Sequence, residues 1–424
     1  MSEQTLAAAM LRMQEQGTEP QANLKARLAQ AERRNRWRAL ALVAPLLIFV
    51  LVTFLLPLAS MLYRSVHNPL VAESLPQTVA ALSQWQFAGL PDEQAYAALA
   101  QELISLRQSN DLGKIASRLN NEYSGMRSLM TATARELSRA SSASQYSALL
   151  QSLDKRWGEP GPWAAIKVLG EPYNLSNYLA ALDYTYGADG SVQAQPESRQ
   201  IYQSLFLRTL GLTLAITGLC LLLGFPLAYL LANLPEKTAN LLLILVLLPF
   251  WTSLLVRTSA WIVLLQSQGV LNDLLLWLGL IEQRLEMMHN HIGTLVAMTH
   301  ILLPFMVLPL YSVMKSISPV YLRAARSLGA KPAYAFIKVY LPQTLPGIGA
   351  GGLLVFILSV GFYITPALVG GRSGQMISNF IAYHMQTSLN WGLAAALGGL
   401  LLALVLMLYA LYNRLVGIQN LKVG

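Results

Sequence analysis

The stretch that decides the fold runs Tyr321-Leu322-Arg323-Ala324-Ala325-Arg326-Ser327-Leu328-Gly329 and continues to Val339-Tyr340-Leu341-Pro342. It lies between two long apolar segments, and it carries basic residues within and beside it: Lys315, Arg323, Arg326, Lys331 and Lys338. A short basic loop between two apolar spans is expected on the cytoplasmic side of a membrane. Gly329 permits a sharp turn, so the stretch predicts two short helices around a glycine. The first helix presents a face of small and apolar side chains that another protein can approach closely: Ala324, Ala325 and Leu328.

The composition is that of a membrane protein. The chain is 54% hydrophobic and only 12% charged, whereas soluble domains average about 25% charged residues. Its net charge of +9 is unevenly spread: +3 over residues 1–38, −2 over residues 64–204 and +8 over the remainder. The positive charge thus flanks apolar segments, which favours a positive-inside bias over a nucleic-acid partner. Cys220 is the one cysteine, so an intramolecular disulfide is excluded.

Six apolar segments are long enough to cross a bilayer, since about 20 helical residues span its hydrocarbon core. The predicted spans are residues 39–63, Leu205–Ala232, Thr238–Leu265, Ile292–Met314, Thr344–Val369 and Trp391–Leu415. Residues 1–38 end in a basic cluster, which predicts a cytoplasmic N-terminal tail. The connecting loops that this topology puts inside hold more Lys and Arg than those outside. The sequence therefore predicts an all-α, multi-pass membrane protein with the 316–343 loop in the cytoplasm.

Residues 64–204 form a polar insert on the outer side of this topology. Apolar residues recur there at helical spacing in three stripes: Tyr96, Leu99, Leu103, Leu106; Leu112, Ile115, Leu119, Tyr123; Tyr146, Leu149, Leu153, Trp157. Such stripes on polar helices predict a small helical subdomain with a core of its own. Two interpretations stay open, structural scaffolding and docking of a partner.

The loop pattern is that of a known family. Ala324-Ala325, Gly329 and then Val339-x-Leu341-Pro342 resemble the EAA loop of permease subunits in binding-protein-dependent ABC importers. Arg323 stands where that family usually has the Glu of the motif. Further stretches resemble the spermidine/putrescine branch: Leu223–Tyr229, Pro249–Thr258, Thr365–Gly371 and Met376–Asn379. The likeness covers the first span and roughly residues 172–415, and it leaves the insert between about 70 and 170 outside.

This resemblance implies the fold of a type I ABC importer permease, with five helices in residues 205–424 and a coupling loop at 316–343. It implies that the loop docks an ATPase, through Tyr321, Arg323, Ala324, Ala325, Arg326, Leu328, Gly329 and Pro342. The implied partners are a second permease subunit, two ATPase subunits and an extracytoplasmic binding protein, in a bacterial inner membrane. The sequence contains no phosphate-binding Gly-x-x-x-x-Gly-Lys-Ser/Thr motif, so ATP and Mg²⁺ are expected on the ATPase and no cofactor or catalytic residue on this chain.

Five residues are candidates for the substrate pathway: Trp251, Arg257, Phe362, Tyr363 and Thr365. Arg257 falls inside a predicted span, where an unpaired Arg costs roughly 2.5–3.5 kcal/mol on insertion scales. It is either an anion contact or a structural partner of backbone carbonyls, and the second is favoured. Phe362 stands where the related branch carries an acidic residue, and with Tyr363 it offers cation–π contact to an amine. These features favour a polyamine or a related small amine as substrate, with an ω-amino acid as a further candidate.

The sequence leaves other functions to be considered. The His289 and His291 pair with Met287 and Met288 lacks a nearby cysteine, so no metal site is predicted. A secondary transporter or channel would need no ATPase, but it would be expected to carry more ionisable residues in its spans. A membrane-anchored sensor would use residues 64–204 as its ligand domain, yet the sequence shows no cytoplasmic signalling domain.

Overall fold

The computed structural model describes residues 29–139 and 145–416. It divides into two compact units, residues 1–63 and 64–424. Within the described residues, five helices are long and apolar enough to cross a membrane, and six spans result when a bent helix pair is counted as one. The expected all-α membrane fold with about six spans is confirmed, with one small β-hairpin as the exception.

The first span is one continuous helix over Ala29–Val66, which contains the predicted residues 39–63. It includes a π-turn, η1 (Leu51–Leu55), followed by α2 (Leu56–Val66). Pro57 stands two residues after the π-turn, and a proline has no amide hydrogen and its ring crowds the preceding turn. The wider π-turn accommodates that clash without ending the helix. Residues 1–28 of the predicted tail lie outside the described part of the chain.

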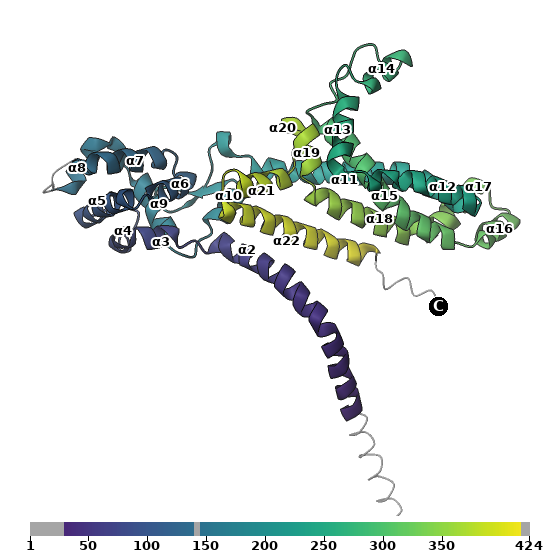
Figure 1. Cartoon of the computed structure of the whole chain (residues 1–424), viewed down its shortest axis with the longest axis horizontal. Helices are drawn as coiled ribbons and strands as arrows, with labels where there is room; N and C mark the ends of the chain where they lie inside the picture. Colours follow the sequence, from purple (N-terminus) through teal and green to yellow (C-terminus); the bar gives the residue numbers. More distant parts are fainter. Residues whose placement is uncertain (1–28, 140–144, 417–424) are drawn as a thin grey trace, which may run out of the picture. The chain divides into compact units, whose positions relative to one another are not determined.

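Three helices form the centre of the second unit: α11 (Tyr202–Asn233), α15 (His291–Ser316) and α18 (Leu341–Gly361) (Figure 1). Their shared core is aliphatic and Met-rich, with Cys220, Met298, Leu302, Met306 and Val355 all buried. Gly224 and Gly351 both face Met306, where a Cβ would come within 3.1 Å of its atoms. Small residues at these crossings allow the three helices to pack closely. The last span, α22 (Trp391–Val416), contacts α18 and α21 (Ile377–Gln386).

The predicted span Thr238–Leu265 is broken. It consists of α12 (Glu236–Leu247), a 3₁₀ turn η4 (Leu248–Trp251) and α13 (Leu254–Leu265), with a bend of 97°. Pro249 starts this change, and Thr252 and Ser253 are extended rather than helical. The chain then forms α14 (Val270–Trp277) and a loop up to α15. The hydropathy of the sequence shows the apolar content of this segment but not its direction.

The predicted span Thr344–Val369 also differs from the structure. The helical path begins earlier, with α17 (Pro332–Ala335) and a second π-turn η5 (Phe336–Tyr340), and ends at Gly361. Again a proline, Pro342, stands two residues after the π-turn. Two short helices follow the break, α19 (Ile364–Val369) and α20 (Gly371–Gly374). The helix stops because Pro366 has no amide hydrogen to donate to the carbonyl of Phe362.

The insert is a helical subdomain, described over residues 64–139 and 145–204. Its helices are α3 (Leu70–Ser74), α4 (Pro76–Leu82), α5 (Glu93–Gln108), α6 (Leu112–Glu122), α7 (Met126–Leu137), α8 (Tyr146–Leu153), α9 (Pro160–Gly170) and α10 (Ser176–Ala181), with 3₁₀ turns η2 (Lys155–Gly158) and η3 (Glu197–Arg199). An antiparallel hairpin pairs β1 (Tyr184–Tyr186) with β2 (Val192–Ala194), with Tyr184 opposite Ala194. Gly190, at φ +75°, lies in its turn.

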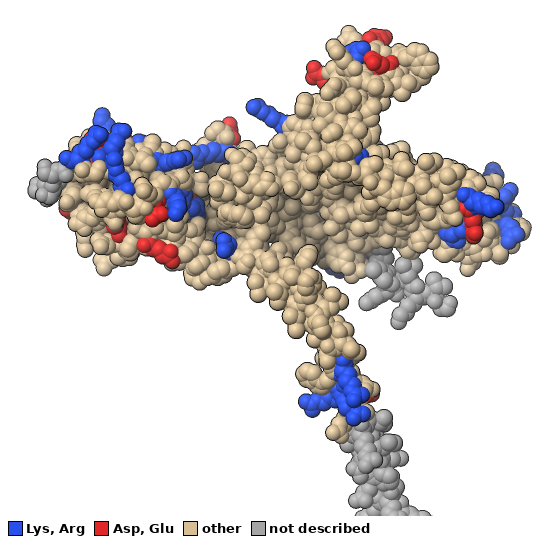
Figure 2. Space-filling model, in the orientation of Figure 1, with Lys and Arg blue, Asp and Glu red and all other residues tan. Residues whose placement is uncertain are grey.

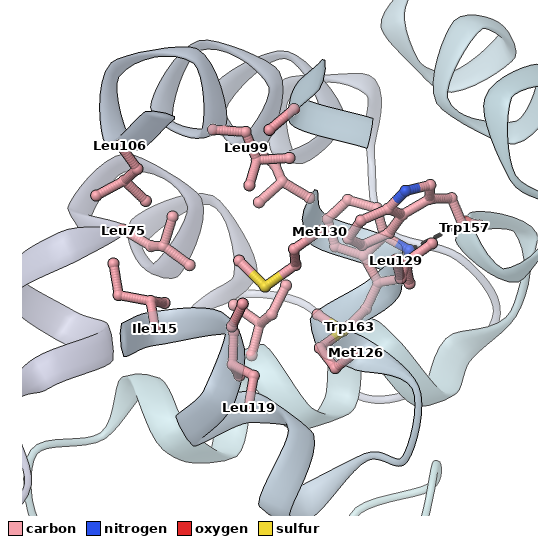
Figure 3. Packing of buried hydrophobic residues seen from close by; sticks show 14 of the residues in the cluster. Leu75, Leu99, Leu106, Ile115, Leu119, Met126, Leu129, Met130, Trp157 and Trp163 are labelled. Carbon is pink, nitrogen blue, oxygen red and sulfur yellow. Dashed lines mark hydrogen bonds between the residues drawn. The ribbon is translucent and has the colours of Figure 1, made fainter. Parts of the chain in front are cut away.

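The insert has its own hydrophobic core, drawn from α3 through α9 (Figure 3). Its centre is Trp157, which is fully buried; its indole donates to Thr133 Oγ1 at 2.9 Å. The Trp157 carbonyl accepts hydrogen bonds from the Tyr96 hydroxyl (2.7 Å) and from the Trp163 indole (3.1 Å). The aromatic side chains therefore bury apolar area while each polar tip is satisfied.

The first two predicted stripes face this core, although Tyr123 at the end of the second is only partly buried. The third stripe is wrong in detail. Helix α8 ends at Leu153, which is 37% exposed, and Trp157 lies on the following 3₁₀ turn. Asp154 ends the helix because its carboxylate accepts from the Arg156 amide at 3.0 Å and caps that turn. Helix α7 was missed, although Met126, Leu129, Met130, Thr133 and Leu137 follow helical spacing and are buried.

The end of the insert is joined to the central helices by polar contacts. The Asp183 carboxylate accepts from the backbone amides of Ile201, Tyr202 and Gln203 at 2.8–3.0 Å and so caps α11. Asn177 donates to the carbonyl of Ser65 at 2.9 Å, and α10 packs on α22. The end of the insert is thus held by one helix cap, from Asp183, and by one side-chain hydrogen bond, from Asn177.

Candidate functional site

The predicted loop forms helix α16 (Pro319–Ser327), which begins and ends with recognisable caps. Ser318 is the N-cap and accepts from the Val320 amide at 3.4 Å, and Pro319 occupies the first helical position. At the other end Gly329 has φ +88° and donates to the Arg326 carbonyl at 3.0 Å, while Ala330 donates to the Ala325 carbonyl at 3.1 Å. This is a Schellman arrangement, and it requires a residue that tolerates the left-handed region.

Helix α16 is uncovered in the described chain. None of its residues is buried, and Leu328 just after it is 90% exposed. Tyr321, Ala324 and both arginines, Arg323 and Arg326, are exposed as well, and Ala325 is partly so. Figure 2 shows Lys and Arg side chains gathered at this end of the bundle. The predicted loop residues therefore share one exposed, basic helix and its cap, apart from Pro342.

Pro342 lies elsewhere, in the first turn of α18. It lines an apolar groove of about 790 Å³ whose walls come from α11, α18 and α22. Pro342 is therefore outside α16 and lies at the start of a span.

An aromatic cluster, which the sequence reading missed, joins the loop to the spans. It consists of Phe225 and Tyr229 on α11 with Phe336 and Tyr340 in η5. Phe336 stacks on Tyr340 with centroids 5.4 Å apart, and Tyr229 meets both rings edge-on, at 5.6 Å and 5.4 Å. Phe225 contacts Phe336 edge-on at 6.3 Å. The signal in the sequence is two aromatic pairs, each four residues apart, which lie on one face of a helix.

Arg257, on α13, lies at the break of the bent pair. Its guanidinium donates to the carbonyl of Pro249, to the carbonyl of Thr252 at 3.0 Å and, more weakly, to Thr252 Oγ1 at 3.4 Å. These carbonyls have lost their helical partners because the chain turns at Thr252 and Ser253. Hydrogen bonds to backbone carbonyls are what we expect if Arg257 is a structural partner of the broken helix. Trp251, at the end of η4, is 73% exposed.

The other three pathway candidates lie at the end of α18. The Phe362 carbonyl accepts from the Ser378 hydroxyl at 2.6 Å, which replaces the donor that Pro366 lacks. The Tyr363 carbonyl accepts from the side-chain Nδ2 of Asn379 at 2.7 Å. Thr365 is buried, and its hydroxyl lies 3.2 Å from that of Thr258, the neighbour of Arg257. The two helix breaks are therefore hydrogen-bonded to each other through Thr258 and Thr365.

His289 and His300 make hydrogen bonds to neighbouring parts of the chain. His289 has φ +58°, and its amide donates to the Val369 carbonyl at 2.9 Å; His300 Nδ1 accepts from the Trp261 indole at 3.1 Å. No group of three or more His, Cys, Asp or Glu side chains within residues 29–139 and 145–416 could hold a metal ion.

Comparisons with known proteins agree with this architecture. Residues 221–417 match the family described as the binding-protein-dependent transport system inner membrane component. The spermidine/putrescine transport system permease protein PotB of Salmonella typhimurium (strain SL1344) is 38% identical over 252 residues, which are 59% of this chain and 82% of that protein. PotB of Escherichia coli (strain K12) is 37% identical over 251 residues, which are 59% of this chain and 86% of that protein.

Among solved structures, a bacterial ABC transporter involved in the import of the acidic polysaccharide alginate has a chain of which this protein covers 79%. That match covers 50% of this chain at 21% identity with a TM-score of 0.38, which is too slight to add to the argument. The family model and the identity to the two permeases carry the assignment. The family has no catalytic activity of its own and leaves ATP to a separate ATPase subunit. The chain belongs to the family of binding-protein-dependent transport system inner membrane components and is a multi-pass permease subunit of an ABC importer.

Proposed function

We propose that this permease carries a polyamine or a related small amine, an ω-amino acid included. The single observation that carries the proposal is the 37–38% identity to permeases named for spermidine and putrescine transport. The residues at the α18 break support an amine of lower net charge. Phe362 and Tyr363 offer aromatic faces, worth roughly 0.5–2 kcal/mol to a cation, at a place where the resemblance leads one to expect a carboxylate.

The acidic residues of the C-terminal half fit the same proposal. Glu236 starts α12, and Asp273, Glu282 and Glu286 lie between α13 and α15. Apart from Glu236 at the first residue of α12, the spans from α11 to α22 therefore carry no carboxylate within the described residues. A pathway without carboxylates replaces the hydration of a dication poorly, and it suits an amine that carries a balancing negative charge better.

The exposed surfaces of this chain support a proposal for the partners of the complex. α16 with its basic, uncovered face is the site at which an ATPase subunit docks, and the complex contains two ATPases, a second permease subunit and an extracytoplasmic binding protein. The N-terminus then lies in the cytoplasm and the insert outside, because basic loops stay on the inner side and long polar domains translocate largely regardless of charge.

Alternating access is the proposed mechanism. ATP-driven closure of the ATPases moves α16 as a lever, and the aromatic cluster of Phe225, Tyr229, Phe336 and Tyr340 passes that movement to α11 and α18. The helix breaks at Arg257 and Phe362 are the positions where the spans bend around a central cavity.

Uptake measurements test the substrate. Cells carrying the intact system are compared for uptake of labelled putrescine and of labelled 4-aminobutyrate, with a strain that lacks this chain as control. Uptake of either amine that depends on this chain supports the proposal. Uptake of neither, together with robust transport of a sugar or an inorganic anion, contradicts it.

A further inference from the structure

A pocket of about 300 Å³ lies in the insert, away from the loop and the helix breaks described above. Its walls come from the loop after α4, the C-terminal end of α9, the segment that follows α9 and the hairpin. The side chains that matter here are Phe87, Lys167, Glu171, Tyr173 and Tyr186, with Gly190 at the rim. A volume of this size is at the small end of the range for ligand sites, about 300–1,000 Å³.

Specific contacts hold the walls of this pocket in place. Phe87 has φ +60°, a conformation that a bulky residue adopts only when the surroundings hold it. A Cβ on Gly190 would lie 3.0 Å from the Phe87 ring, so a glycine is needed on that side. On the other side Lys167 Nζ lies 4.8 Å from the ring centroid and donates to the carbonyl of Trp85.

The aromatic wall formed by Tyr186 is held in the same way. Glu122 on α6 accepts from the Tyr186 amide at 3.4 Å and from the Thr185 hydroxyl at 3.1 Å. Burial raises the pKa of the Tyr186 hydroxyl, and the negative charges of Glu122 and Glu171 add to that shift. Glu171 and Tyr186 both line the pocket.

The charges of the lining select a class of ligand. Lys167 lies in the last turn of α9 and Glu171 is the residue that follows the helix, and both line the pocket. They do not form an ion pair with each other in the described structure. One ammonium and one carboxylate, beside three aromatic rings, favour neither a diamine nor a simple anion, since each would meet a like charge.

We propose that this pocket binds a small zwitterion whose ammonium and carboxylate are separated by a short carbon chain, that is, an ω-amino acid. The ligand carboxylate meets Lys167, and its ammonium meets Glu171 and the Tyr173 and Tyr186 side chains. The choice of ligand class rests on the proposed amine transport, and the site would select, outside the membrane, the zwitterionic member of that class.

Binding measurements on the intact complex in nanodiscs, without ATP, test the site. The probes are 4-aminobutyrate, butylamine and butyrate, which share the chain and differ in charge. The wild-type complex is expected to bind 4-aminobutyrate saturably, at least tenfold more tightly than either singly charged probe. Absence of saturable 4-aminobutyrate binding overturns the proposal.

Charge variants make the test specific. Glu171→Gln should weaken 4-aminobutyrate binding at least tenfold and abolish its advantage over butyrate. Lys167→Met should abolish the advantage over butylamine, whereas Lys167→Arg, which keeps the charge in the pocket, should largely preserve binding. Glu197→Gln removes an exposed carboxylate outside the pocket and should change nothing. Equal affinities of the wild type and Glu171→Gln overturn the proposal.

A variant at Phe362 distinguishes binding in the pocket from binding in the transport pathway. If Phe362→Ala abolishes 4-aminobutyrate binding and Glu171→Gln does not, the ligand occupies the transport pathway and the pocket proposal is wrong. If the pocket binds 4-aminobutyrate as expected while cells take up neither amine, the pocket stands and the proposed transport function fails.

Discussion

At the scale of single residues, the C-terminal cap of α16 depends on one glycine. A Cβ on Gly329 would meet no atom within 4 Å, so a side chain there is not excluded by crowding. The constraint is its backbone, at φ +88°, where L-residues are strained by roughly 1–2 kcal/mol. The C-cap of α16, and with it the orientation of the basic face, therefore rests on that residue.

Gly329→Val should impair transport by tenfold or more and leave membrane insertion intact. The expected cause is a displaced α16 that no longer engages the ATPase, so the ATPase should also be lost from pull-downs. Gly113→Val is the matched control, because Gly113 is equally open but lies at an ordinary φ in α6. Normal pull-down and transport by Gly329→Val would remove the docking assignment.

Arg257 gives a second prediction at this scale. If it serves the broken helix by capping the carbonyls of Pro249 and Thr252, Arg257→Gln should reduce uptake of putrescine and of 4-aminobutyrate in parallel. An anion contact would instead affect only the substrate with a carboxylate, through its KM. Arg284→Gln is the control, since Arg284 also donates to a carbonyl, that of Ser267, and is more exposed.

At the scale of elements, the insert should fold by itself because its core is drawn wholly from residues 71–169. Circular dichroism of the isolated 70–200 fragment should show a helical spectrum with a cooperative thermal transition. Trp157→Ala should lower the free energy of unfolding by about 3–5 kcal/mol, whereas Leu153→Ala, at a partly exposed position, should cost far less. A random-coil spectrum of the parent fragment would contradict an autonomous core.

The same fragment should lose stability in acid. The Arg156 side chain holds the pKa of Asp154 below its usual 3.8, and hydrogen bonds from Ser147 and Tyr146 lower the pKa of Glu93 from 4.5. A lowered pKa stabilises the fold above the unfolded value, and that contribution disappears as pH falls through the folded value. The melting temperature should therefore fall from about pH 4.5 downward, and Asp154→Asn should have a flatter profile there than Lys155→Gln, a neighbouring control.

At the scale of the whole molecule, the proposed topology puts the insert and α16 on opposite sides of the membrane. Cys220 is the one native cysteine and is buried, so single engineered cysteines report access without a background signal. Ser109→Cys, in the insert, should react with an impermeant maleimide in intact spheroplasts. Ala330→Cys, after α16, should react only once the membrane is opened, and the reverse pattern would invert the topology.

The sequence by itself determined the class of this protein. Long apolar segments must be membrane helices, because a bilayer offers no partner to unpaired backbone groups. The spacing from Ala324 to Pro342 marked the loop that resembles the EAA loop of ABC importer permeases. Apolar periodicity likewise revealed two of the core helices of the insert. These features are local, since each depends on residues a few positions apart.

Tertiary structure decided where the spans break and what satisfies the breaks. Hydropathy counts apolar residues, and it is blind to the 97° bend after Pro249 and to the stop before Pro366. The donors that replace the lost helical bonds, Arg257 and Ser378, are 8 and 16 residues away from their acceptors, and Thr258 meets Thr365 across 107 residues. Such pairings depend on how helices pack, which no short window of sequence contains.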